Sequence, residues 1–345
     1  MSRVPHSLSI LRVGLCSPLG LSAAMTRAEV YAGTLRFQET EVMDSADEPV
    51  RASRLSLLPA ELSRTERIAA LSTQALKDCL AGAGELPNPL PLLLALPEEH
   101  GPNAVDGTRV TQAIGAACPD GLTIRTEYIH RGGRAAFWSL LDRAPDYVLR
   151  SRTGRVLLGA VDSLVDGGSL RTLARARGHL SELNRDGRLP GEAAAFVLLG
   201  PRDKSPGSRL HARVVAWANT SEPRHFSQGE PNLGAGLTLA FRQLSSRSNG
   251  RVHRLLSAQP GETFWSRELG QAYLRNAALM PEPFGVEMLA GSLGDVGVAS
   301  GGVLLELAIS DPPRWGGPPD SPRRALLYAC ADDGAVGASL VEVMA

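Results

Sequence analysis

The sequence has few lysines, few cysteines and no long apolar run, and each shortage narrows what the protein can be. Only Lys77 and Lys204 are lysine among 36 basic residues, which balance 36 acidic ones. A net charge of zero provides no overall field to attract nucleic acid or an anionic membrane. No apolar run approaches the roughly 18 residues that a membrane-spanning helix needs. We therefore expect a cytoplasmic protein with no nucleic-acid partner and no membrane partner.

The four cysteines are too scattered for a disulfide framework or a zinc site. Cys16, Cys79, Cys118 and Cys330 form no Cys-x-x-Cys pair, so a reducing compartment is expected. Histidines other than His130 show no metal-ligand spacing. The glycines form neither a Gly-x-Gly-x-x-Gly sequence after a strand nor a phosphate-binding loop. The sequence therefore predicts no metal and no cofactor.

Strand-like and helix-like patterns alternate along the chain, which favours a layered α/β fold. The clearest helix covers 63–80, where Ser63 and Glu66 form a capping-box pattern and the apolar residues share one face. The Pro-, Gly- and Ser-rich stretch 201–208 is a candidate connection, and the alternation resumes after it. We therefore predict two domains, 1–203 and 204–345. The stretches 33–61 and 218–231 are predicted to be polar loops.

Two neighbouring segments, "GRVLLGAVDSLVDGGSL" and "NRDGRLPGEAAAFVLLG", resemble the β-ketoacyl synthases of the thiolase-like superfamily. In that family a core strand ends in Gly-Gly-x-Asp, and an Asp-Gly-x-x-Pro-Gly-Glu-Gly-Ala turn enters the next strand. The counterparts here are Gly159 to Asp162 and Asp186 to Ala194. The resemblance implies two stacked α/β halves, each with a mixed five-stranded sheet between helices (αβαβα), and a homodimer.

The turn in this resemblance has structural roles that follow from its residues. Asp186 and Gly187 permit a tight turn, Pro190 fixes φ, and Gly191 allows a close approach of the backbone. Glu192 can accept hydrogen bonds from buried amides in the turn. None of these roles is catalytic.

The resemblance assigns catalysis to a cysteine at a helix start and to two histidines, and this chain has none of them in place. The cysteine position falls at His130, or at Tyr128 after a two-residue shift. The histidine positions fall at Gln259 and Asp295, and the family's lysine falls at Ala290. A carboxylate at Asp295 would repel a developing enolate. We therefore expect no condensation of thioesters.

Other arrangements of these residues stay open. Cys118, in "AACPDGL", is similar to the family's cysteine context, although it precedes the strand that should deliver the nucleophile. His130 and Asp295, beside Gln259, can form an acid/base pair or simply satisfy one another's hydrogen bonds. Arg131 and Arg134 lie beside helix-entry glycines, where they can hold an anion or be solvated.

Three functions follow from these observations. The first is a catalytically inactive, ketosynthase-like adaptor, scaffold or chaperone. Met43-Asp44-Ser45 and Gly159–Leu164 resemble segments of thiolase-like proteins associated with bacterial type VI secretion, which suggests a secretion effector or spike component as partner. The second is a cysteine-less chain-length subunit or a divergent acyl transferase of fatty-acid or polyketide synthesis, with an acyl carrier protein or a synthase as partner. The third is a sensor that uses a residual acyl pocket.

Overall fold

A computed structural model describes residues 7–98, 104–151, 153–201, 211–248, 250–310 and 322–344. Ten of the strands in these residues form one sheet, in the order β10-β9-β11-β12-β8-β1-β7-β6-β4-β5. None of the helices in the described ranges combines the length and apolar character needed to cross a bilayer.

The ten-stranded sheet consists of two five-stranded parts with the same topology. The strands of the first part are β1 (Leu8–Cys16), β4 (Leu90–Leu96), β5 (Ile124–Arg131), β6 (Val156–Ser163) and β7 (Glu192–Gly200). The strands of the second part are β8 (His211–Ser221), β9 (Arg254–Ser257), β10 (Glu287–Met288), β11 (Arg323–Cys330) and β12 (Ala335–Met344).

In each part three parallel strands are followed by two antiparallel ones. β5, β4 and β6 run parallel, and β7 and β1 are antiparallel to their neighbours. β10, β9 and β11 repeat this arrangement with β12 and β8. Antiparallel pairing of β1 with β8 joins the two parts. The expected pair of mixed five-stranded sheets is therefore confirmed. The predicted boundary between 1–203 and 204–345 lies outside the described residues and stays a prediction.

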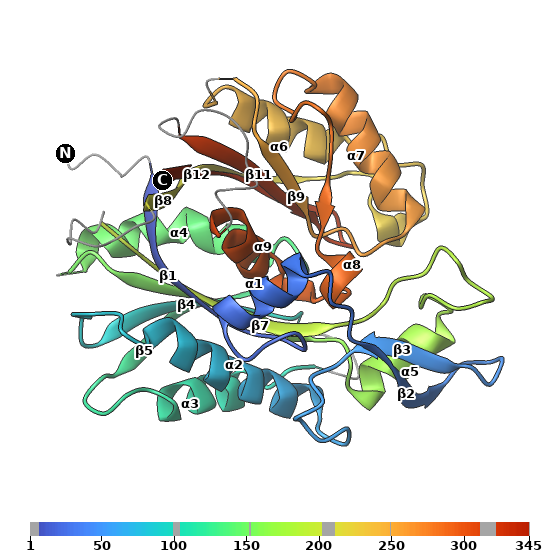
Figure 1. Cartoon of the computed structure of the whole chain (residues 1–345), viewed down its shortest axis with the longest axis horizontal. Helices are drawn as coiled ribbons and strands as arrows, with labels where there is room; N and C mark the ends of the chain where they lie inside the picture. Colours follow the sequence, from blue (N-terminus) through green and yellow to red (C-terminus); the bar gives the residue numbers. More distant parts are fainter. Residues whose placement is uncertain are drawn as a thin grey trace.

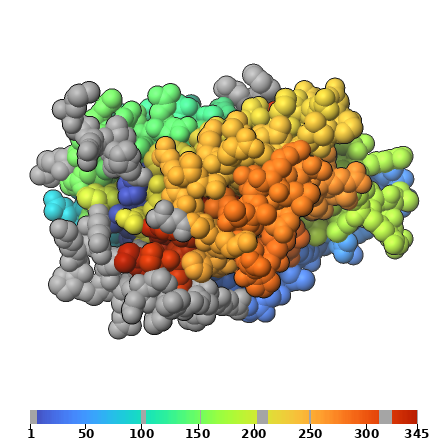
Figure 2. All heavy atoms as spheres, turned by 90° about the horizontal axis from the view of Figure 1, so that it is seen from above, coloured from blue at the N-terminus to red at the C-terminus, as the bar shows by residue number. Residues whose placement is uncertain are grey.

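Helices fill the space between the two parts and cover their outer faces (Figure 1). The helices are α1 (Ala23–Tyr31), α2 (Arg64–Leu80), α3 (Gly107–Ala116), α4 (Ala136–Arg150), α5 (Gly167–Arg175), α6 (Ala235–Ser245), α7 (Thr263–Arg275), α8 (Ala290–Leu293) and α9 (Ser300–Ile309), with 3-10 turns η1 (Phe226–Gln228) and η2 (Gly297–Ala299). α4 and α9 share the central core with strands of both parts. α2 and α3 cover the first part, and α6 and α7 the second. Figure 2 shows α6 and α7, in yellow to orange, covering much of one face.

The predicted helix over 63–80 is confirmed as α2. Ser63 Oγ accepts from the Glu66 amide, and the Glu66 carboxylate accepts from the Ser63 amide, so the capping box is complete. Cys79 lies on the buried face, as predicted. Gly14 lets β1 contact this helix, because a Cβ there would lie 2.2 Å from the Cys79 nitrogen.

The prediction of polar loops was wrong in part. The stretch 33–61 contains a two-stranded hairpin, β2 (Phe37–Met43) and β3 (Pro49–Ser53). Its few apolar residues pack against residues of and before α5; this cluster contains Val42, Val50, Ala52, Val165, Leu170 and Ala174. The polar residues of the other hairpin face hid the alternation. In 218–231, β8 continues to Ser221 and η1 forms a single turn.

Candidate functional site

The Pro-Gly-Glu turn anchors β7 in the middle of the molecule. A Cβ on Gly191 would lie 2.1 Å from the Leu293 carbonyl oxygen, so the predicted close approach is confirmed. Glu192 is fully buried and accepts at 2.8 Å from the Leu55 amide, which lies just after β3 and not in the turn whose amides were the predicted partners. It also binds Arg67 in a bidentate ion pair, at 2.7 and 2.8 Å, which the sequence did not reveal.

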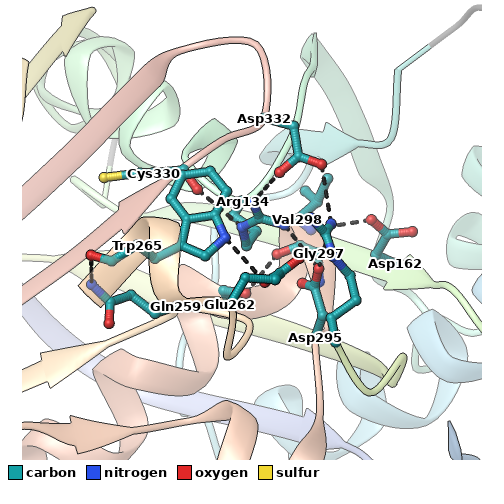
Figure 3. A network of polar contacts seen from close by, with 12 residues as sticks. Arg134, Asp162, Gln259, Glu262, Trp265, Asp295, Gly297, Val298, Cys330 and Asp332 are labelled. Carbon is teal, nitrogen blue, oxygen red and sulfur yellow. Dashed lines mark hydrogen bonds and ion pairs between the residues drawn. The ribbon is translucent and has the colours of Figure 1, made fainter. Parts of the chain in front are cut away.

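Asp162, at the end of β6, holds the entry to α9. Its Oδ2 accepts from the Val298 amide at 3.1 Å, and its Oδ1 accepts from Arg64 Nη2 at 2.7 Å (Figure 3). Gly297 has a φ of 52°, and a Cβ there would lie 2.0 Å from Asp162 Oδ2. Glycine is therefore required at this position.

Beside this entry, Arg134 lies at the centre of a buried set of charges (Figure 3). Its side chain precedes α4 and is only 4% exposed. Arg134 Nη1 donates to Asp295 Oδ2 at 2.8 Å, Nη2 donates to Asp332, and Nε donates to the Cys330 carbonyl at 2.9 Å. Its guanidinium stacks 4.8 Å from the centre of the Trp265 ring.

A second arginine, Arg188, completes the set. It donates to Glu262 at 2.6 Å and to Asp332 at 3.0 Å, and it lies 3.5 Å from Asp295. We call Arg134, Arg188, Glu262, Asp295 and Asp332 the arginine–carboxylate network. Two cations face three carboxylates, and Glu262 also accepts from Trp265 Nε1 at 3.1 Å.

The network stabilises the ionised forms of Arg134 and Asp332. Burial disfavours the charge on Arg134, but Asp295 and Asp332 outweigh burial and raise its pKa well above the usual range. Burial also disfavours the charge on Asp332, yet the two arginines lower its pKa to about 2. Burial raises the pKa of Glu262, partly offset by Arg188. Arg134 and Asp332 therefore keep their charges at neutral pH and cannot exchange protons with a substrate there.

The three residues that the resemblance places at the catalytic positions have different hydrogen-bond partners. Asp295 belongs to the network. Gln259 is buried, donates from Nε2 to the Trp265 carbonyl at 2.7 Å, and faces an apolar hollow of about 260 Å³ beside α7. His130 ends β5, with Tyr128 Oη 3.4 Å from Nδ1. Burial lowers the pKa of His130, opposed by Asp333. In the described residues, His130 makes no hydrogen bond to Asp295 or Gln259, and Asp295 is paired with Arg134 instead.

Cys118 lies at the wrong end of a helix for a nucleophile. It follows Ala117, the C-cap of α3, with Sγ 3.5 Å from the Ile114 carbonyl oxygen. The helix dipole disfavours a thiolate at this end, and burial raises the pKa of Cys118. The other three cysteines are buried, and burial foremost raises the pKa of Cys16 and of Cys79 to about 12. None of the four thiols is activated.

The remaining sequence candidates also have structural partners. Arg131 donates to the Pro97 and Val105 carbonyls, both at 3.2 Å, and Arg134 is held by carboxylates, so both guanidiniums already have protein partners. Asp44 accepts from the Ala46 amide at 2.7 Å and contacts His179 Nε2 at 3.0 Å. Searching the described ranges finds no His, Cys, Asp and Glu group able to hold a metal ion.

Sequence reasoning missed Arg188, Glu262 and Asp332 as members of the network. Arg188 stands inside the quoted turn motif and Asp332 follows the last core strand but one, but neither position carries a pattern that identifies its partner. The one available indication of the network was that polar residues stand at the ends of strands, next to glycine-containing turns.

Comparisons with known proteins define the fold. No protein-family model matches the sequence, and the curated proteins give no match. Among solved structures, the chain resembles the ishigamide ketosynthase/chain length factor, with 18% identity and a TM-score of 0.67 over 98% of this chain and 100% of that one.

Two ketosynthases of larger size are similar as well. The oxazolomycin ketosynthase domain of Streptomyces albus JA3453 gives a TM-score of 0.70 at 14% identity, over 97% of this chain and 75% of that one. The ketosynthase from module 6 of the bacillaene synthase of Bacillus subtilis 168 gives a TM-score of 0.69 at 11% identity, over 97% of this chain and 72% of that one. The chain therefore has the thiolase-like ketosynthase fold.

Proposed function

We propose that this protein is a non-catalytic subunit with a ketosynthase fold, which acts by binding a partner protein. The observation that carries the proposal is the arginine–carboxylate network. At the position that the resemblance gives to a catalytic histidine, Asp295 is fixed by Arg134 at 2.8 Å. Losing one group that stabilises an oxyanion typically costs ~10²–10³ in rate, and groups of one catalytic unit fail together.

Intact-protein mass spectrometry after incubation with a panel of acyl thioesters tests the absence of catalysis. We expect no acyl adduct on the wild-type chain, because each thiol is buried or lies at a helix C-terminus. The variants Cys118→Ser and His130→Ala serve as controls. An adduct that disappears in Cys118→Ser would overturn the proposal and return the protein to the acyl transferases.

A specific observation favours a partner in acyl-chain synthesis. The ketosynthase/chain length factor covers nearly the same length as this chain. The second candidate is therefore a cysteine-less subunit that pairs with a condensing enzyme. The role in secretion rests on two short motifs, and both have structural explanations. Asp44 accepts hydrogen bonds within the β2–β3 turn, and Gly159–Leu164 forms the last part of β6 and the residue after it.

Identification of co-purifying molecules distinguishes these candidates. A synthase subunit or an acyl carrier protein supports the second candidate, and a secretion component supports the adaptor predicted from the motifs. A bound acyl compound supports the sensor and would turn attention to the apolar hollow beside Gln259. Location in the cytoplasm stays a prediction.

We also propose that the subunit dimerises through β5. The sheet ends at β5 on one side and at β10 on the other. β10 has two residues, whereas β5 has eight, so β5 is the long open edge of this sheet. An open edge of this length pairs readily with a strand of another chain.

A further inference from the structure

A polar hollow of about 470 Å³ lies between the start of α2 and the start of α5. Its volume falls within the range of small-ligand sites. The residues that line it include Ser63, Arg64, Thr65, Asp166, Gly167 and Arg171. The central network and the fold's catalytic positions use none of these residues, so this hollow is a separate feature of the molecule.

Two buried polar atoms at the hollow have no hydrogen-bond partner in the described part of the chain: Asp166 Oδ2 and Arg64 Nε. Asp166 is only 5% exposed. Its other oxygen caps α5, accepting from Gly168 at 2.9 Å and Ser169 at 3.1 Å. Arg64 uses Nη2 to bind Asp162. Buried polar atoms are rarely left unpaired, and a hydroxyl can satisfy both, because it donates to a carboxylate and accepts from Nε.

The same hollow is lined by an arginine, Arg171, whose charge is not paired with a described residue. The guanidinium of Arg171 forms no hydrogen bond or ion pair with any described residue, and Nη1 lies 3.0 Å from the position of a Cβ on Gly167. Gly167 is the first residue of α5, and the amides of the next two residues are already capped by Asp166, so Arg171 is the group left to pair with an anion. Glu41 in the wall is neutralised by Arg54, at 2.8 and 3.0 Å. Glu61 lies exposed at the rim.

We propose that this hollow binds a small organic anion that carries a hydroxyl close to its charged group, such as a phosphorylated polyol. The hydroxyl lies between Arg64 Nε and Asp166 Oδ2, and the anionic group lies against Arg171. The inference is independent of the proposed function.

Isothermal titration calorimetry on the full chain tests this site with glycerol 3-phosphate, inorganic phosphate and glycerol as probes. Glycerol 3-phosphate is expected to bind at least tenfold more tightly than either fragment. Arg171→Gln should weaken its binding at least tenfold. Asp166→Asn keeps the cap oxygen but replaces the unpaired acceptor with a donor, so it should abolish the preference for glycerol 3-phosphate over phosphate. Asparagine caps helices as well as aspartate does, and this variant is expected to fold.

Arg175→Gln is the matched control. Arg175 lies one turn after Arg171 on α5 and does not contribute to this hollow. It should leave the affinity for glycerol 3-phosphate unchanged. Equal weakening by Arg171→Gln and Arg175→Gln would show attraction to surface charge alone and would overturn the proposal. Absence of binding at millimolar glycerol 3-phosphate would overturn it as well.

Discussion

At the scale of single residues, the dominant feature is charge that is buried and fully paired. Arg67 and Glu192 both have 0% exposed side chains and are 125 positions apart in the chain. Taking charges out of water costs several kcal/mol for each ion, so the ions depend on each other's presence. The same dependence holds for Arg134 and Asp295.

Glu192→Gln should lower the free energy of unfolding by about 3–5 kcal/mol, because it leaves the Arg67 cation buried without its counter-ion. Urea denaturation at pH 7 measures the change. Glu282→Ala is the control, since Glu282 and Arg251 form an ion pair with both side chains largely exposed, and it should cost less than about 1 kcal/mol. A Glu192→Gln variant no less stable than the control would contradict the energetic role of the pair.

Asp332→Asn should make the free energy of unfolding depend less on pH in the acid range. The two arginines lower the pKa of Asp332 to about 2, so its contribution is complete above the pKa of an unfolded aspartate, about 4. It is lost as the pH falls towards 2. Its side chain is 39% exposed, and allowing for solvent screening, we expect a loss of about 1–2 kcal/mol at pH 7.

Urea unfolding of wild type and Asp332→Asn between pH 7 and pH 2 measures this effect. The difference between the two proteins should narrow below about pH 4. Asp333→Asn, at the next position, is the control, because Asp333 forms no ion pair with a described arginine and asparagine still accepts from the Ala335 amide. A difference independent of pH would point to lost packing instead.

Ion pairs of this kind explain which contacts could not be predicted from the sequence. Glu192 belongs to a turn motif that predicts a bond to amides of the turn, whereas its observed partners Leu55 and Arg67 lie 137 and 125 positions away. Arg134 was assigned to solvent or to an anion, because its partners Asp295 and Asp332 lie 161 and 198 positions away. Which charges meet depends on how the two five-stranded parts are placed, and no local pattern carries that information.

At the scale of elements, long apolar patterns were predictable and short mixed ones were not. α2 combines a capping box with a continuous buried face, and its bounds agree with the prediction within one residue. α3 was not predicted, since it buries only Gly107, Val110 and Ile114. The β2–β3 hairpin was missed for the same reason: few of its residues enter a core.

Asp186→Ala should weaken the start of α7. The Asp186 carboxylate accepts from the Thr263 amide at 2.6 Å and from its hydroxyl at 2.5 Å, so a residue of the turn motif caps a helix that covers the second part of the sheet. Loss of such a cap costs about 1 kcal/mol, measured by urea denaturation. Asp186→Asn keeps an acceptor oxygen and should recover most of the stability; equal losses in both variants would contradict capping.

At the scale of the whole molecule, the network joins the two five-stranded parts of the sheet. Arg134 and Arg188 precede β8, whereas Glu262, Asp295 and Asp332 follow it. The repeated topology was suggested by the alternation of elements, although the two parts share no visible repeat of residues. Topology is set by which strands bury apolar faces, and many different sequences satisfy that requirement. This explains why the fold could be predicted while the contents of the site could not.

The open edge of the sheet at β5 is the proposed surface for dimerisation. A second copy that pairs with β5 in antiparallel orientation extends the sheet across a twofold axis. Ile129 lies on this strand and is 39% exposed. Ile129→Lys brings two like charges close to that axis and should raise the dimer dissociation constant at least tenfold. Leu149→Lys, on α4 with 43% exposure, is the matched control and should have no effect.

Sedimentation velocity over a range of concentrations measures both variants. A wild-type chain that stays monomeric, or an Ile129→Lys variant that dimerises like the control, would exclude β5 as the interface. In the second case the exposed apolar residues elsewhere become the surfaces to test, since a closed dimer needs a self-complementary patch. A monomeric Ile129→Lys variant that still binds the partner protein would show that partner binding and dimerisation use different surfaces.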